Sequence, residues 1–362
     1  DRKDYWAVKQ PNGTTSVPAN GGVTDPPASA AANDDWRRKY GGWMAVIVVL
    51  AVLCVIPFHM GLSRVDTATV FFISVILAVS YRLVTTTGDW GFAHIIFQGV
   101  GAYAAALLGK HAGIPFIVMV PLAGLVTAAV GAIVMYPMLR TKGFGFFITS
   151  FAFGELIRMI WIKAKNPFGG SGGIINIPMP ELFGLKLYSL VNYYFACMAF
   201  MVISVFIMWR LDRSRIGNVW KSIHTDHMLA ECMGVNVARY RTLAFAVGSF
   251  FAGIAGALVA YRLGSIDPHN FNINEMVYLV IWVVIGGAAT FWGPLIGVTL
   301  LTVVFELSRE LEEWRPMMFG GILIMFLIFL PGGLESLLPA LRRPPSEHYA
   351  RFRKWLTTVK PG

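Results

Sequence analysis

The sequence predicts an all-α fold, a polytopic bundle of membrane-spanning helices. Of the 362 residues, 56% are hydrophobic and only 14% are charged, against roughly 25% charged in an ordinary soluble domain. The mean hydropathy is +0.61, and apolar runs recur that could each form a helix of about 20 residues, the length that crosses a bilayer. This composition excludes a soluble enzyme.

The apolar runs and their polar interruptions indicate ten candidate spans. They cover residues 43–62, 67–84, 91–109, 115–137, 144–162, 190–209, 242–262, 275–289, 294–308 and 317–338. The eighth and ninth are short, and the glycine-rich stretch from Gly286 to Pro294 separates them. They could therefore be broken or re-entrant helices, so we expect eight to ten crossings between residues 43 and 338.

The basic residues predict the orientation of the bundle. If the N-terminus is cytoplasmic, 21 of the 30 Lys and Arg residues fall in inner segments and 8 in outer ones, with Arg158 inside a span. Because cytoplasmic flanks carry the excess of basic residues, this distribution places both termini inside. It also explains the net charge of +10 without a nucleic-acid partner. Residues 1–42 are then a polar cytoplasmic arm, and 339–362 form a basic cytoplasmic tail.

A long inner connection, 210–241, holds six basic and three acidic residues. Within it, the run TDHMLAECMG predicts a short, separately capped helix, with Thr225 as N-cap, Asp226 in the first turn and Gly234 just past the end. A helix of about nine residues is marginal alone in water, so a partner or adjacent helix ends should hold it. An interfacial linker helix is the alternative.

Six segments in order resemble the LivM-type permeases, the membrane subunits of branched-chain amino acid ABC importers. They are GDWGFAHIIFQGVGAYAAALL (88–108), LRTKGFGFFITSFAFGELIR (139–158), GGSGGI (169–174), RSRIGNVWKSIHTDHMLAECMGVNVARYRTLAFAVGSFFAGIAGAL (213–258), VIGGAATFWGPLIG (284–297) and LPGGLESL (330–337). Together they cover most of the chain from about 45 to 340.

The resemblance implies the ABC importer permease fold in a bacterial inner membrane. It implies import of branched-chain or other hydrophobic amino acids, with urea, amides or small carboxylates as the alternative cargo. The implied partners are a second homologous permease subunit, two cytosolic ATPases and an extracytoplasmic substrate-binding protein. The loop helix would dock on an ATPase. Its expected coupling residues are Thr225, Asp226, His227, Glu231 and Gly234.

The chain departs from the family pattern at two places. Gly217-Asn218 and His224-Thr225-Asp226 stand where relatives often carry additional bases, which implies a changed ATPase surface. The family's Leu-Ser-Leu-Gly-His is replaced by the run from Asp89 to His94, which puts an acid and an indole near an inner helix end.

Polar side chains inside spans are candidates for the transport pathway, because ionisable groups there need a partner or a water-filled cavity. Glu155 and Arg158 are three residues apart and could pair on one helix. An internal ion pair that orients packing is the alternative. His94, Gln98 and Tyr103 are further pathway candidates, although the neighbouring glycines make helix packing the simpler account.

An outer connection before the eighth span contains Asp267, Asn270 and Glu275. Such polar rims are typical of protein docking surfaces, so these residues could receive the binding protein. An ordinary solvated loop is the alternative.

No catalytic motif is evident in the sequence. A phosphate-binding loop ending in Lys and Ser/Thr is missing, so ATP hydrolysis is expected from separate subunits. His224 and His227 have no third ligand nearby in the sequence, and no metal or other cofactor is expected. The competing hypothesis is a stand-alone secondary transporter or channel, which would need an intramembrane ion site that the few charged residues in the spans do not suggest.

Overall fold

The computed structural model describes residues 61–141, 143–177 and 189–307, together with scattered positions outside these ranges. Its helices and strands from α2 onward belong to one compact unit, His59–Gly362. The predicted polar arm, the basic tail, and most of the first and tenth candidate spans lie outside the described residues.

Long apolar helices form most of this unit, which confirms the all-α expectation. Five are long and apolar enough to cross a membrane: α2 (Leu62–Thr85), α4 (Phe116–Met138), α5 (Phe144–Lys163), α7 (Leu190–Asp212) and α10 (Val237–Leu263). The predicted count of ten crossings is therefore not confirmed within the described ranges. Each of the five overlaps a predicted span, because a long apolar run is sufficient to predict such a helix.

Three further helices correspond to predicted spans but are not among these five. They are α3 (His94–Ala112), α11 (Ile273–Gly286) and α12 (Gly293–Leu307). A helix rises 1.5 Å per residue, so the 14 residues of α11 cover only about 21 Å, less than the ~30 Å hydrocarbon layer. The length of α11 fits a helix that ends part-way across better than a full crossing.

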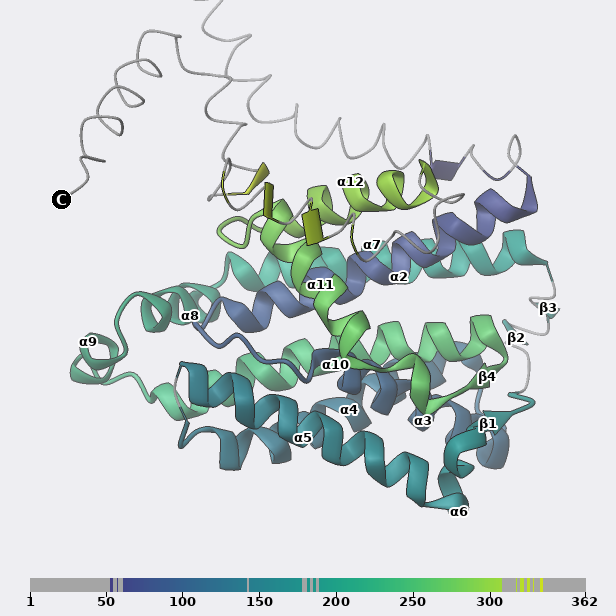
Figure 1. Ribbon diagram of the computed structural model, residues 1–362, viewed down its shortest axis with the longest axis horizontal. Helices are drawn as coiled ribbons and strands as arrows, with labels where there is room; N and C mark the ends of the chain where they lie inside the picture. Colours follow the sequence, from purple (N-terminus) through teal and green to yellow (C-terminus); the bar gives the residue numbers. More distant parts are fainter. Residues whose placement is uncertain are drawn as a thin grey trace, which may run out of the picture. The chain divides into compact units, whose positions relative to one another are not determined.

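Short elements join the long helices. They are α6 (Lys165–Phe168), η1 (Gly170–Gly172), β1 (Ile174–Ile175), β2 (Glu181–Leu182), β3 (Leu185–Lys186), α8 (Arg215–Thr225), α9 (His227–Cys232), β4 (Ser265–Ile266) and η2 (Pro268–Asn270). Strand β1 pairs antiparallel with β4, and β2 with β3. The β1–β4 pair and α9 lie at opposite ends of α10 (Figure 1).

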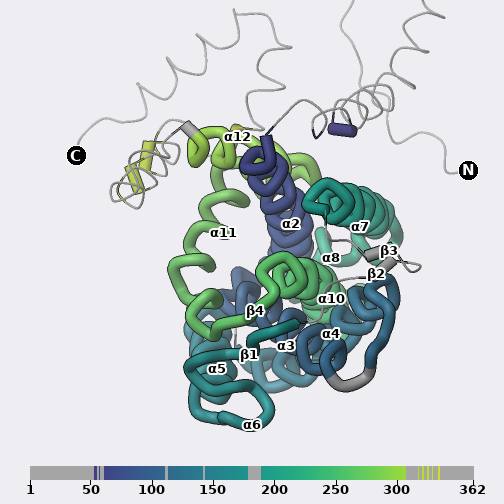
Figure 2. The backbone as a smooth tube through the Cα atoms, turned by 90° about the vertical axis from the view of Figure 1, so that its right-hand side faces the viewer, coloured from purple at the N-terminus to yellow at the C-terminus, as the bar shows by residue number. Residues whose placement is uncertain are grey.

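Helix α10 is the centre of the packing. It packs most extensively against α4 and α3 and also contacts α2, which in turn packs on α7 and α12. Figures 1 and 2 show the result as two layers, α2, α7 and α12 in one and α3, α4, α5 and α10 in the other, with α11 passing along one side.

Small residues allow the close approach of α10 to α3. A Cβ atom added to Gly256 would overlap the carbonyl oxygen of Gln98, and one added to Gly101 would overlap the backbone of Gly253. These contacts agree with the small-residue pattern of the sequence, which predicts helix association.

We expect Gly256→Ala to destabilise the bundle by ~1–3 kcal/mol, because the new methyl group must push α3 and α10 apart. Thermal unfolding of the purified protein in detergent measures the change. Gly61→Ala is the matched control, since a Cβ there has open space around it. Equal midpoints for the two variants would contradict the importance of this contact.

Candidate functional site

The connection 210–241 folds as two helices rather than one. Ser214 caps α8, its Oγ accepting a hydrogen bond from the Gly217 amide at 3.3 Å. Trp220 and Ile223 are buried on one face of α8, and Trp220 Nε1 donates to the Tyr240 carbonyl at 2.9 Å. Helix α8 was not predicted from the sequence, although its apolar residues recur at helical spacing after a serine N-cap.

The N-cap of α9 is Asp226, not Thr225. Asp226 Oδ1 accepts hydrogen bonds from the amides of Met228 and Leu229 at 2.8 and 3.1 Å. Thr225 is the last residue of α8 and bonds back to the Lys221 carbonyl at 3.0 Å. The prediction of Thr225 as cap was wrong because α8 occupies that residue, and a carboxylate caps as well as a hydroxyl.

The other end of α9 lies as expected. Gly234 follows the helix with a φ of +82°, a left-handed conformation that glycine adopts without steric cost. Its amide donates to the Glu231 carbonyl at 2.9 Å, and the Val235 amide donates to the Ala230 carbonyl at 3.1 Å. This arrangement ends the helix and turns the chain toward α10.

An apolar surface is exposed on and just after α9. Met228, Leu229 and Met233 are 76%, 62% and 78% exposed. Of the expected coupling residues, Thr225, Asp226, Glu231 and Gly234 are exposed and His227 is half-buried. A surface of this kind marks an interaction site more often than an isolated exposed residue does.

A buried ion-pair network connects α8 to the bundle. Arg82 of α2 donates from Nη1 to Asp212 Oδ1 at 2.6 Å, with the two side chains 3% and 9% exposed. Lys221 of α8 reaches the other carboxylate oxygen of Asp212 at 3.0 Å. Arg82 also donates to the carbonyls of Ala288 and Ala289, both at 3.3 Å. One guanidinium therefore ties α8, through Asp212, to the connection between α11 and α12.

A second buried pair lies where the sequence departs from the pattern that it otherwise resembles. Asp89 accepts two hydrogen bonds from Arg241 of α10, at 2.7 and 2.5 Å, and a third from Thr87 Oγ1 at 3.0 Å. The charge of Asp89 is thus neutralised. This pair fixes the connection between α2 and α3 to the first part of α10.

Neither network was predicted from the sequence. In the sequence, Arg82 served only to predict the orientation of the helices, and Asp212 was only one of the three acids between residues 210 and 241. The available signal was a lone arginine at the end of an apolar run, which needs a buried partner. The partner itself is 130 residues away in the sequence, so no local pattern identifies it.

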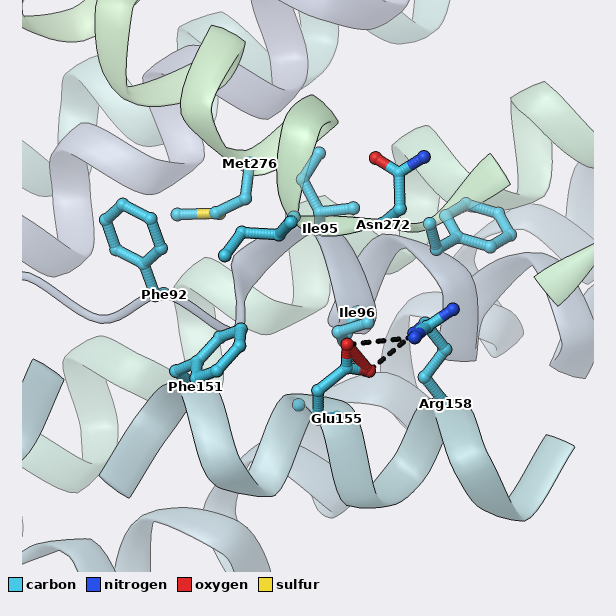
Figure 3. A pocket seen from close by; sticks show the side chains of 11 residues that line it. Phe92, Ile95, Ile96, Phe151, Glu155, Arg158, Asn272 and Met276 are labelled. Atoms are coloured by element: carbon cyan, nitrogen blue, oxygen red, sulfur yellow. Dashed lines mark hydrogen bonds and ion pairs between the residues drawn. The ribbon is translucent and has the colours of Figure 1, made fainter. Parts of the chain in front are cut away.

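A pocket lies between α3, α5 and α11 (Figure 3). Its empty space is about 270 Å³, including its open mouth. Most of its lining is apolar, and the charged residues are Glu155 and Arg158 of α5. The complete lining is Phe92, Ile95, Ile96, Phe151, Gly154, Glu155, Arg158, Phe271, Asn272, Ile273 and Met276.

Glu155 and Arg158 form the ion pair that their spacing predicts. Arg158 Nε donates to Glu155 Oε2 at 2.5 Å, and Nη2 donates to Oε1 at 2.9 Å. Their side chains are 32% and 17% exposed. The pair is therefore partly open to the pocket, and Figure 3 shows both side chains at its wall, opposite Asn272 and Met276.

The other pathway candidates do not line this pocket. His94 is buried and shares a 2.9 Å hydrogen bond with Ser80 of α2. Gln98 is buried at the close contact with α10. The Tyr103 ring stacks on Trp161 with centroids 4.6 Å apart. These three surroundings match the packing alternative.

The docking candidates flank the pocket. Asp267 caps η2 by accepting from the His269 amide at 2.8 Å, and Asn270 ends η2 and is exposed. Glu275 is exposed in the first turn of α11. Between them the chain contributes Phe271, Asn272 and Ile273 to the pocket lining, so the structure brings two separately predicted sites together.

Comparison with known proteins assigns this architecture to a family. Residues 63–330 match the family described as "Branched-chain amino acid transport system / permease component". The chain belongs to this family. A permease of this kind is a membrane transport component and not itself an enzyme.

Similar permeases give a consistent description. The high-affinity branched-chain amino acid transport system permease proteins LivM of Salmonella typhimurium and Escherichia coli are each 31% identical over 336 residues, covering 86% of this chain and 79% of theirs. The autoinducer 2 import system permease protein LsrC of Escherichia coli is 25% identical over 215 residues, covering 57% of this chain and 59% of LsrC. No solved structure matches the chain significantly.

The two ion pairs of Asp212, with Arg82 and with Lys221, should contribute differently to the stability of the protein. Asp212→Ala leaves Arg82 buried without its carboxylate, and we expect a loss of ~3–5 kcal/mol in stability. Lys221→Ala removes a half-exposed partner and should cost no more than about 1 kcal/mol. Thermal unfolding of the two purified variants compares them, and a larger loss for Lys221→Ala would contradict the order.

The cap of α9 can be tested separately. Asp226→Ala should destabilise α9 by about 1 kcal/mol, because two amides lose their acceptor. Hydrogen exchange of the amides from Leu229 to Cys232 should then accelerate. Thr225→Ala is the matched control, since Thr225 bonds within α8. If both variants accelerate exchange equally, Asp226 is not the cap.

Proposed function

We propose that this chain is the transmembrane permease subunit of an ATP-driven ABC importer. It passes branched-chain or other hydrophobic amino acids, delivered by an extracytoplasmic binding protein, across a bacterial inner membrane, with both termini cytoplasmic. The observation that carries the proposal is the α8–α9 pair, which combines an exposed apolar surface with an ionic connection to the bundle, from the half-exposed Lys221 to the buried Asp212–Arg82 pair. The names of the LivM relatives support the cargo.

In this proposal, α8 and α9 are the coupling segment that docks on a cytosolic ATPase. Met228, Leu229 and Met233 supply the apolar contact, and Asp226 and Glu231 supply charge at its rim. Methionine suits a surface that must stay in contact while the partner moves, because its side chain is flexible. The surrounding coupling residues Thr225, His227 and Gly234 shape the ends of α9.

Movement of the ATPase then reaches the bundle through Lys221, Asp212 and Arg82. The buried pair resists separation, since removing either charge leaves the other uncompensated. Displacement of α8 therefore pulls on Arg82 and on the two carbonyls between α11 and α12 that it binds. This is a physical route from the coupling segment to the helices beside the pocket.

The complete importer contains further subunits. A second homologous permease pairs with this chain, and two ATPases supply the energy, because this sequence contains no phosphate-binding loop of the GxxxxGK[ST] type. The relative LivH, also named a permease protein, matches 38% of this chain at 27% identity. On the other side, Asp267, Asn270 and Glu275 receive the binding protein.

Reconstitution tests the assignment. The chain, assembled with its partner permease, ATPases and binding protein in proteoliposomes, should take up leucine only when ATP is supplied on the ATPase side. The chain reconstituted alone should show no uptake driven by a proton or sodium gradient. Gradient-driven uptake without an ATPase would overturn the proposal in favour of a secondary transporter.

Docking by α9 predicts a specific loss. Met228→Glu should weaken ATPase association by about tenfold or more, because burying a methionine side chain contributes ~1.5–3 kcal/mol and the new charge opposes burial. Co-purification of the ATPase with the tagged permease measures the loss. Ile175→Glu is the matched control, an exposed apolar residue in β1 at the opposite end of α10. Equal retention of the ATPase by both variants would exclude α9 from the interface.

A further inference from the structure

The pocket between α3, α5 and α11 presents one positive and one negative group to an otherwise apolar space. Glu155 and Arg158 neutralise each other, so the site has no net charge to attract a simple ion. Such a pair instead complements a molecule that carries both charges close together. An α-amino acid at neutral pH is such a molecule, with an ammonium and a carboxylate on neighbouring atoms.

The ion pair has bonding capacity left for a ligand. A guanidinium carries five N–H donors, and a carboxylate has about four lone-pair sites. The pair uses two of each, and no other partner takes the rest among the residues that the structure describes. A zwitterion can therefore dock beside the pair, with its carboxylate on Arg158 and its ammonium on Glu155, without breaking it.

The apolar part of the pocket suits an aliphatic side chain. Ile95 and Ile96 of α3, Phe151 of α5 and Met276 of α11 surround the charged pair. The pocket opens on one side, and its empty space of about 270 Å³ includes that mouth, so a ligand would lie at the mouth against these side chains.

The charges discriminate among the possible cargoes. Urea and simple amides can hydrogen-bond to both groups, but they are neutral and gain no charge–charge attraction. A small carboxylate matches Arg158 but is repelled by Glu155. A ligand with both charges is attracted by both groups, and the apolar wall favours a hydrophobic side chain over a polar one.

The pocket also lies where a delivered ligand would enter. Phe271, Asn272 and Ile273 line it, and the same segment carries the docking candidates Asp267 and Glu275. Asn272 fixes this segment by accepting from the Glu275 amide and donating to the His269 carbonyl, both at 3.1 Å. A binding protein seated on the rim would release its ligand beside the ion pair.

We infer that this pocket is a transient binding site for a zwitterionic amino acid with an aliphatic side chain, in which Arg158 binds the carboxylate and Glu155 the ammonium. The inference rests on the proposed importer function and adds to it a site and a chemical basis for cargo selection. The site binds the amino acid weakly, because Glu155 and Arg158 already neutralise each other in part.

The test uses the complete importer in proteoliposomes with binding protein saturated with radiolabelled leucine. Leucine uptake and the ATP hydrolysis stimulated by the liganded binding protein are measured in the same vesicles. For Glu155→Gln/Arg158→Gln we expect leucine transported per ATP to fall by about tenfold or more, the loss expected from one or two charge-assisted hydrogen bonds. Stimulation of ATP hydrolysis should persist, because docking and coupling are intact.

Two further variants separate binding from structure. Glu155→Asp/Arg158→Lys retains both charges and should recover most of the uptake. Asp66→Asn/Arg262→Gln neutralises another ion pair, which joins α2 to α10 with bonds of 2.8 and 2.7 Å outside the pocket, and should retain normal uptake per ATP.

Three outcomes would overturn the inference. They are unchanged uptake per ATP in the neutral variant, a parallel fall in its ATPase stimulation that marks a structural role, and no recovery in the charge-retaining variant. Absence of ATP-dependent leucine uptake by the unaltered importer is a different result, since it overturns the proposed function itself.

Discussion

The fold depends on the close approach of α10 to α3 and α4. Lipid is as apolar as leucine, so helices in a membrane gain little from hiding apolar surface and associate through close packing instead. Glycines on both sides of the contact let backbone meet backbone, as Gly256 does at the Gln98 carbonyl and Gly253 at Gly101. Without this contact α3 would not stand beside α10, and the pocket that α3 shares with α5 and α11 would lose one wall.

Ion pairs supply the specificity that packing of small residues lacks. Arg241 with Asp89 and Arg82 with Asp212 both join segments far apart in the sequence. A buried pair is not a general source of stability, since desolvation offsets much of its attraction. Its effect is geometric, because a displaced partner would leave an unpaired charge. These pairs therefore fix how the segments before and after α8–α9 are placed against the bundle.

The sequence predicted the parts of this structure that are set by local chemistry. Long apolar runs predicted α2, α4, α5, α7 and α10, and a spacing of three residues predicted the pairing of Glu155 with Arg158. Local sequence signals predicted the N-cap residue less well where one helix ends and the next begins. Thr225 and Asp226 are both good caps, and only the presence of α8 decides between them.

Contacts between distant segments could not be predicted. Asp212 and Arg82 come into contact only when α2 and α7 pack together, and the sequence near either residue does not identify the other as its partner. The pocket is a similar case, since its lining comes from α3, α5 and α11 and from the segment before α11. For His94 and Gln98, helix packing was the simpler of the two accounts that the sequence left open, and in the structure His94 shares a hydrogen bond with a hydroxyl and Gln98 lies at a helix contact.

The position of the glycine contact along α10 has a mechanical consequence. Gly253 lies 16 residues after the start of α10 and 10 before its end, so the contact divides the helix into arms of about 24 Å and 15 Å. If the contact acts as a fulcrum, α10 is a lever whose long arm begins beside α9 and whose short arm leads through β4 and η2 to the segment that lines the pocket. A swing of the long arm then arrives at the short arm as a smaller displacement with greater force. Such an arrangement suits a step that needs force more than a large movement.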